Sequence, residues 1–175
     1  MVYDAIEQAA TSLSANFDAD LAALATAKGE AGITQTATVY KRRPATVLFA
    51  LAAVTGSGVT LPAIGVWVQR TATQARRQDV RDNVHQLVFD YVARSAGVTA
   101  GSDVTLEKQA ELAAEALLRT VDRLVTAGGG YFGAGELAGS VVIELSGLAM
   151  GPGQSYYEEH VRLTCPVTER DTGLA

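Results

Sequence analysis

Two long segments of the chain carry apolar residues at the spacing of a single helix face. Within Asp4–Lys28, and in a second segment that ends near Leu124, these residues recur every three or four positions. Such a period places them in one stripe, so each segment is predicted to form an amphipathic helix that buries one side. Gly29 suits a C-terminal stop for the first helix, and Thr105 suits an N-cap for the second. The stripes consist of Ile6, Ala10, Leu13, Phe17, Leu21 and Leu24, and of Leu106, Ala110, Ala113, Leu117, Val121 and Leu124.

Five further segments have the composition and alternation of β-strands. Ala45–Ala53 is apolar on both faces, as expected of a central strand, and Pro62 opens the next segment, where a missing N–H does no harm. The order is helix, three strands, helix, two strands, which predicts an α+β fold. We expect residues 1–175 to form one domain, with a mainly antiparallel sheet of about five strands and both helices packed on one face. The predicted strands are Ala45–Ala53, Pro62–Val68, Val84–Val92, Val141–Leu145 and Tyr156–Val167.

The last strand alternates between an apolar and a polar face. Glu159 is the one polar residue on the apolar face, so the pattern predicts a half-buried antiparallel strand. Cys165 and His160 fall on opposite faces, which argues against a Cys–His nucleophile pair. Glu158 and Glu159 are also on opposite faces and do not form a paired acid and base.

Two connecting segments have distinctive compositions. Residues 69–83 are polar and of mixed charge, and they are too many for a tight hairpin turn, so they are predicted to project from the sheet as a β-hairpin arm. Residues 126–137 are rich in glycine. A phosphate-binding loop would follow a strand and be followed by Lys-Ser/Thr, and neither holds here. This segment is therefore predicted to be a flexible connection.

The balance of charge narrows the range of partners. The chain has 14 Lys and Arg against 19 Asp and Glu, a net charge of −5. An acidic chain gains no overall attraction to nucleic acid or anionic lipid, so neither sequence-specific nucleic acid nor a membrane is an expected partner. A single Cys forms no intrachain disulfide, and Asp4 and Glu7 stand where a signal peptide would carry positive charge. We expect a soluble protein made in the cytoplasm.

The residues with catalytic or ligand-binding potential form no convincing site. His85 and His160 lack the spacing of metal ligands, so we expect no metal, no cofactor and no catalytic residue. Asp90 in the middle of a strand is either a general base or, as we favour, a carboxylate on an edge strand or subunit contact that pairs with arginine. A ligand-binding or enzymatic alternative would need His85, Asp90 and Glu144 to converge. The histidines are expected at the surface or at an interface.

The basic residues suggest contacts between subunits. Lys41–Arg43 precedes an apolar segment, where charges guard against aggregation. Arginines of the arm can fork onto carboxylates of a neighbouring copy. The predicted interface residues are Gln69, Arg70, Arg76, Arg77, Asp79, Arg81 and Asp82.

The layout of the whole chain resembles the tail terminator and tail completion proteins of long-tailed bacteriophages. The resemblance lies in the order of elements and not in a chemical motif. It rests on the helix Asp4–Lys28, LPAIGVWVQ at Leu61–Gln69, RDNVHQLVFDYVA at Arg81–Ala93, ELAAEALLRTVDRL at Glu111–Leu124 and YYEEHVRLTCPVTERD at Tyr156–Asp171.

The resemblance implies a structural role in the virion neck. Members of the family form six-membered rings that cap the tail tube, stop its polymerisation and join it to the head connector. The partners implied are further copies of the chain, the tail tube protein and head–tail connector proteins, after assembly in the host cytoplasm. The arm Gln69–Asn83 would reach an adjoining subunit. The Gly-rich loop Gly128–Gly135 departs from the pattern, which leaves open a head–tail connector or stopper protein, or a cellular oligomeric adaptor that shares only the layout.

Overall fold

The computed structural model describes residues 2–30, 32, 36–41, 60–75, 81–95, 97, 100–126, 141–149 and 156–171. Within these ranges the chain forms the helices α1 (Val2–Ala27) and α3 (Ser102–Thr126) and a five-stranded sheet. The strands are β1 (Thr38–Tyr40), β2 (Ala63–Ala75), β3 (Arg81–Arg94), β4 (Val142–Ala149) and β5 (Glu158–Asp171).

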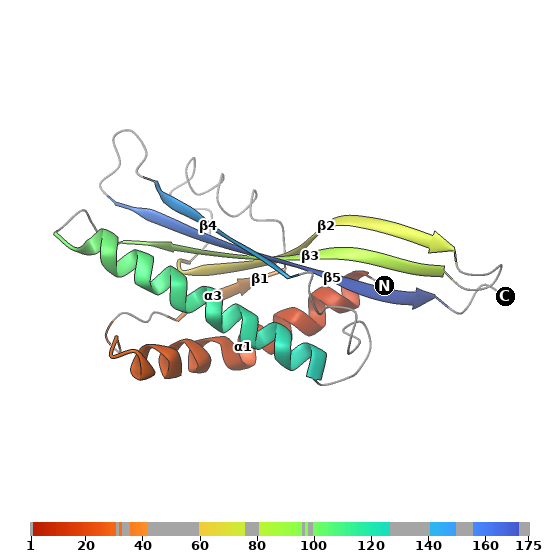
Figure 1. The fold of residues 1–175 in the computed structure, drawn as a ribbon, viewed down its shortest axis with the longest axis horizontal. Helices are drawn as coiled ribbons and strands as arrows, with labels where there is room; N and C mark the ends of the chain where they lie inside the picture. The colour runs from red at the N-terminus through yellow and green to blue at the C-terminus, as the bar shows by residue number, and fades with distance from the viewer. Residues whose placement is uncertain are drawn as a thin grey trace.

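The sheet has the order β1-β2-β3-β5-β4. Only β1 and β2 run parallel, and the other neighbouring pairs are antiparallel. Both helices lie below the sheet in Figure 1 and leave its opposite face uncovered by helix in the described part of the chain. The predicted α+β class, with a mainly antiparallel sheet and both helices on one face, is confirmed.

Both predicted helices are confirmed, and their ends show how the local sequence acts. After α1, Gly29 adopts a φ of +76°, a conformation that favours glycine. The Gly29 amide donates to the Thr26 carbonyl at 3.1 Å, and the Glu30 amide donates to the Ala25 carbonyl at 2.7 Å. These two bonds satisfy carbonyls that the helix end leaves unpaired.

The start of α3 differs from the prediction. The helix begins at Ser102, so Thr105 is a first-turn residue and not the N-cap. The Thr105 hydroxyl donates to the Gly101 carbonyl at 3.0 Å. The sequence contains several residues with hydroxyl or carboxylate side chains in a row here, and each is a plausible cap on composition alone.

The core lies between the helices and one face of the sheet. In β3 the odd-numbered residues Leu87, Phe89 and Tyr91 are fully buried in this core. The Tyr91 hydroxyl accepts a hydrogen bond from Gln109 Nε2 at 2.8 Å, which satisfies two buried polar groups at once. Burial raises the pKa of Tyr91 above its usual value, so the phenol stays neutral. The predicted stripe residues Leu13, Phe17, Leu21, Leu24, Leu106, Ala110, Ala113, Leu117 and Val121 are also buried here.

Ion pairs join the two helices and show that they run antiparallel. Lys28, just past the end of α1, lies 2.8 Å from Glu115 of α3. Asp20, earlier in α1, pairs with Arg123 near the end of α3 at 2.5 Å. The exposed Lys28–Glu115 pair contributes roughly 1 kcal/mol at most. The apolar residues buried between the helices and the sheet are therefore the main link between the helices.

Several strand predictions need correction or fall outside the structure. The first described strand is β1, a three-residue strand too short to stand out as a pattern. The predicted strand Ala45–Ala53 and residues 127–137 of the predicted Gly-rich loop lie outside the described residues. Strands β2, β3 and β5 are all longer than predicted.

The predicted β-hairpin arm is confirmed by the pairing of β2 with β3, and β5 adds a third strand to it. β2 continues to Ala75 and β3 begins at Arg81, and the two stay paired along the arm. β5 continues beside them as far as Asp171, which is the partner of Arg81. Figure 1 shows these three strands reaching beyond the ends of both helices. The arm is therefore a continuation of the sheet itself.

Candidate functional site

Four of the seven predicted interface residues lie on the described strands of the arm. Gln69 is exposed and sits at an irregularity in the pairing of β2 with β3, between Val68 and Arg70. Arg70 resumes the regular pairing, as the partner of Gln86. Arg76, Arg77 and Asp79 lie outside the described residues.

The other two predicted interface residues have charged partners on β5. The register pairs Arg81 with Asp171 and Asp82 with Arg170. Both residues therefore belong to the backbone ladder that joins β3 to β5 within one copy.

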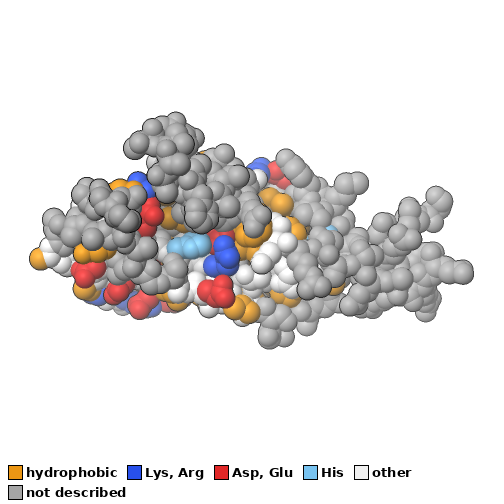
Figure 2. All heavy atoms as spheres, turned by 90° about the horizontal axis from the view of Figure 1, so that it is seen from above, with side chains coloured by type: hydrophobic (Ala, Val, Ile, Leu, Met, Phe, Trp, Pro, Cys, Tyr) orange, Lys and Arg blue, Asp and Glu red, His pale blue; other side chains and the backbone are white. Residues whose placement is uncertain are grey.

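A second group of polar residues lies on the sheet face opposite the helices. Asp90 is in the middle strand β3, and its side chain is fully buried. Trp67 Nε1 donates to Asp90 Oδ2 at 2.7 Å, and Arg162 Nε donates to Oδ1 at 2.8 Å. His160 Nε2 is 2.9 Å from the same Oδ1. Figure 2 views this face and shows a histidine beside basic and acidic side chains, with hydrophobic side chains around them.

The hydrogen bonds keep Asp90 ionised. Burial by itself would raise its pKa, but the hydrogen bonds from His160, Arg162 and Trp67 outweigh burial and hold the pKa below its usual value. An ionised carboxylate only accepts hydrogen bonds, so Nε2 of His160 carries the proton of that bond. A carboxylate held this way is a weak base. The arrangement is that of a buried structural network.

This network corrects part of the prediction for Asp90. Its pairing with an arginine is confirmed, with Arg162 as the partner. However, β3 is the middle strand of the sheet, and Asp90 is buried within one copy, so it lies neither on an edge strand nor at a subunit surface. The alternation of β3 gave the face of Asp90 but not the strand order, which depends on long-range pairing.

The three residues of the enzymatic alternative do not converge. Glu144 of β4 is exposed and is the partner of Arg162, which is itself the partner of Asp90, so these three share one face. His85 belongs to the helix-facing set of β3 residues and is only 2% exposed. The expectation of a surface position is therefore wrong for His85, whereas His160 is partly exposed on the other face.

The opposite faces predicted for β5 are confirmed. Cys165 is buried in the core, and burial raises the pKa of its thiol to about 12, so it is unreactive at neutral pH. His160 lies on the other face with Asp90. Glu158 pairs with Arg94, whereas Glu159 points to the helix side and is 4% exposed.

Glu159 is a polar residue with a buried and incompletely paired side chain. Its Oε2 atom has no hydrogen-bond partner in the described structure. Burial, the largest effect, raises the pKa of Glu159 above its usual value. The sequence contains a signal for this, because Glu159 interrupts the apolar face of its strand. The sequence pattern did not show that the side chain would be buried with one oxygen unpaired.

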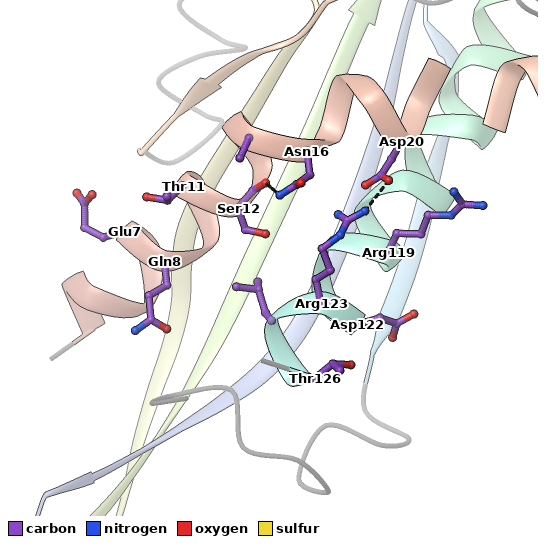
Figure 3. Close-up of a pocket in the computed structure, with 12 residues that line it drawn as sticks. Glu7, Gln8, Thr11, Ser12, Asn16, Asp20, Arg119, Asp122, Arg123 and Thr126 are labelled. Atoms are coloured by element: carbon purple, nitrogen blue, oxygen red, sulfur yellow. Dashed lines mark hydrogen bonds and ion pairs between the residues drawn. The ribbon is translucent and has the colours of Figure 1, made fainter. Parts of the chain in front are cut away.

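An open groove separates one end of α1 from the end of α3. It has a volume of about 1070 Å³. Figure 3 shows polar side chains from both helices along its walls, with Asp20 and Arg123 joined across it. One oxygen of Asp20 and one nitrogen of Arg123 are buried without a partner in the described structure. Sequence reasoning missed this groove because it depends on how the two helices diverge.

The structure adds two observations on ligands and membranes. Among the described residues, no three His, Cys, Asp or Glu side chains come together as a metal site would require. None of the described helices combines the length and apolar character needed to cross a bilayer.

Comparisons with known proteins give no family assignment. No protein-family model matches the chain, and no curated protein matches it significantly. Any function assigned to this chain therefore depends on its residues and its geometry.

Replacing Asp90 with Asn tests the buried network. The variant leaves Arg162 without its counter-charge, and we expect the free energy of unfolding at neutral pH to fall by about 2–3 kcal/mol. Because the folded pKa of Asp90 is below 3.8, its contribution is complete above that pH and is lost as the pH falls further. Urea unfolding between pH 7 and pH 3 measures both effects. Glu158→Gln, in a partly exposed pair, should cost at most about 1 kcal/mol.

Replacing Glu159 with Gln tests a carboxylate whose pKa is raised on folding, in contrast to Asp90. The pKa of Glu159 is raised on folding, so its ionised form destabilises the fold at neutral pH, and the penalty disappears as the pH falls through the folded pKa. We expect Glu159→Gln to raise the free energy of unfolding at pH 7 by up to about 1 kcal/mol. The gain should shrink to zero toward pH 4. A gain that does not depend on pH would show that charge is not its cause.

Proposed function

We propose that this protein is a ring-forming component of the neck of a long-tailed bacteriophage. In this role six copies cap the tail tube, stop its polymerisation and present a surface to the head connector. The main supporting observation is the three-stranded arm, which extends the sheet beyond both helices. An arm of this kind lies beyond the helices of its own copy and is suited to contacts with another.

The charge of the arm supports contact with another copy of the chain. Residues 69–83 contain four arginines and two aspartates, and the paired segment of β5 adds Glu169, Arg170 and Asp171. The three-stranded arm therefore carries a net charge of +1 within a chain of net charge −5, which leaves −6 on the remainder. A basic arm is attracted to the acidic body of a neighbour. This attraction favours association and helps to select the docking orientation.

The geometry of the sheet supports a head-to-tail arrangement. The free side of the arm strand β2 and the outer side of β4 are different surfaces, because β2 and β4 lie on opposite sides of the central strand β3. Contacts between two unlike patches generate a ring when the rotation between copies closes, and a filament when it does not. A cap that stops growth needs the closed form.

The buried network around Asp90 favours this structural role over the enzymatic alternative. Its three side-chain donors already occupy both carboxylate oxygens, and His85 lies on the other face of the sheet. The polar residues of the sheet therefore bond to one another across the strands and do not line a pocket with convergent catalytic groups.

The first test is the state of assembly of the purified protein. We expect rings in negative-stain electron microscopy and a hexamer mass by light scattering. Arg76→Glu with Arg77→Glu should abolish the rings and leave the thermal melting temperature of the monomer unchanged. Arg76→Lys with Arg77→Lys retains the charge and should preserve association at low salt. Rings that tolerate the charge reversal would exclude the arm arginines from the contact.

The second test is an infection in which the gene for this chain is inactivated. Loss of a tail terminator should give tail tubes of irregular, excessive length and separate filled heads, as seen by electron microscopy of the lysate. Tails of normal length that fail to join heads would indicate a connector or stopper. Normal particles would refute the proposal.

A further inference from the structure

One hydrogen bond, taken with the register, shows which way the backbone groups of β5 point. The Ser95 amide, just past β3, donates to the Tyr157 carbonyl at 2.9 Å. Antiparallel strands alternate between hydrogen-bonded and non-bonded residue pairs. The register of β3 with β5 is regular from Glu158 to Asp171, so the odd-numbered residues of β5 bond to β3. Its even-numbered residues direct their backbone groups toward β4.

The same alternation identifies the open edge of β4. Glu144 is the partner of Arg162, an even-numbered residue of β5, so Glu144 uses its backbone groups within the β4–β5 ladder. Ile143 and Leu145 therefore direct their backbone N–H and C=O away from β5. In the described part of the chain, no strand lies on that side of β4.

The neighbouring edge of β5 is closed by proline. β4 begins at Val142, the partner of Thr164, and Pro166 is two residues farther along β5. Pro166 is even-numbered, so its backbone nitrogen faces the same side of β5 as β4 does, but at a position beyond the first residue of β4. The N–H that proline lacks would otherwise be open to a new strand there. Proline on an edge blocks strand addition. The chain protects β5 at this point and leaves β4 unprotected.

The side chains on β4 reinforce this contrast. Val142 and Leu145 are 52% and 51% exposed. With Val104 of α3, they are the large apolar side chains that are at least half exposed in the described structure. An exposed apolar strand edge favours pairing with another strand, and proteins that remain monomers usually guard such edges.

We propose that the β4 edge of one copy binds the arm strand β2 of a neighbouring copy, so that the sheet continues between subunits. This contact rests on the proposed ring and specifies how its subunits join. β1 pairs with β2 only from Ala63 to Gly65, so Gln69–Ala75 has no second neighbouring strand among those described. The basic arm would meet an edge that presents the exposed carboxylate of Glu144.

Charge and symmetry distinguish this partner from a second β4 strand. Two β4 strands pairing with each other would form a closed dimer with identical contacts on both sides. Such a dimer would bring two Glu144-bearing edges together and would leave both basic arms unused. The arm of a neighbour supplies hydrogen-bond partners for the outward backbone groups of β4 and also allows a ring.

Proline substitution on β4 tests the contact without altering the body of the protein. Leu145→Pro removes an N–H that points to the open edge, so the variant should fold with a melting temperature within a few degrees of the wild type. It should form no rings at concentrations where the wild type does. Glu144→Pro removes an N–H of the internal ladder and should destabilise the fold. Leu145→Ala keeps the N–H and should weaken ring formation less than Leu145→Pro. Rings formed by Leu145→Pro would overturn the contact.

Disulfide cross-linking identifies the occupant of the edge. Protein with Leu145→Cys is mixed under mild oxidation with protein carrying Thr71→Cys, Thr73→Cys or Ala75→Cys in turn, and products are resolved by non-reducing electrophoresis. Cys165 does not interfere because it is buried. We expect a covalent pair in at least one mixture. A homodimer of Leu145→Cys alone would assign the edge to a second β4, and no cross-link in any sample would refute the contact.

These outcomes separate the contact from the proposed function. Wild-type rings without any β4–arm cross-link would refute the contact and leave the ring intact. A β4–arm cross-link between the cysteine variants, together with wild-type protein that forms open filaments and no rings, would support the contact and refute the tail-capping role.

Discussion

The uninterrupted antiparallel ladder between β3 and β5 determines most of the structure. Fourteen consecutive residue pairs, from Arg81 with Asp171 to Arg94 with Glu158, run without a bulge. A shift of one residue would exchange the two faces of both strands. The register therefore decides that Phe89 and Leu163 meet the helices, that Asp90 meets Arg162 on the other face, and that the arm extends beyond the body.

Local patterns predicted this fold well, because the repeat of apolar residues along a helix differs clearly from the alternation along a strand. The helical stripes of α1 and α3 and the alternation of β5 follow directly from residue order, and the faces assigned to Cys165, His160 and Glu159 were correct. The length of the arm strands was underestimated because Thr71–Ala75 and Thr168–Asp171 are polar. Polar residues form strands when neighbouring strands supply the hydrogen bonds, and single-sequence patterns do not contain that information.

Strand order and side-chain networks were less accessible from the sequence. Asp90 was correctly paired with an arginine, but its position in the middle strand depends on β3 lying between β2 and β5. The partners Trp67, His160 and Arg162 come from two other strands, and no local signal joins them. The groove between the helices likewise depends on packing geometry. The residues that line it, such as Ser12 and Asp122, are unremarkable in the sequence.

The buried network and the open edge have complementary effects on the sheet. Asp90 links three strands through Trp67 of β2 and through His160 and Arg162 of β5, so it stiffens the centre of the sheet on the face without helices. A charged pair buried in this way adds less stability than apolar packing would, but it disfavours alternative registers. A fixed register at the centre keeps β4 at the edge beside β5 and the free side of the arm strand β2 on the opposite side of the sheet.

In the assembly that we propose, the direction of the arm would decide whether contacts between copies close into a ring. A sheet that continued straight from one copy to the next would twist steadily and build a filament. The pairing of β2 with β3 is irregular between Val68 and Arg70, at the base of the arm. An irregularity of this kind bends a strand and increases its local twist. This one precedes the strand segment that we assign to the neighbouring copy. In the proposed ring, the irregularity at Gln69 would thus set the angle between subunits, and that angle would determine how many copies the ring contains.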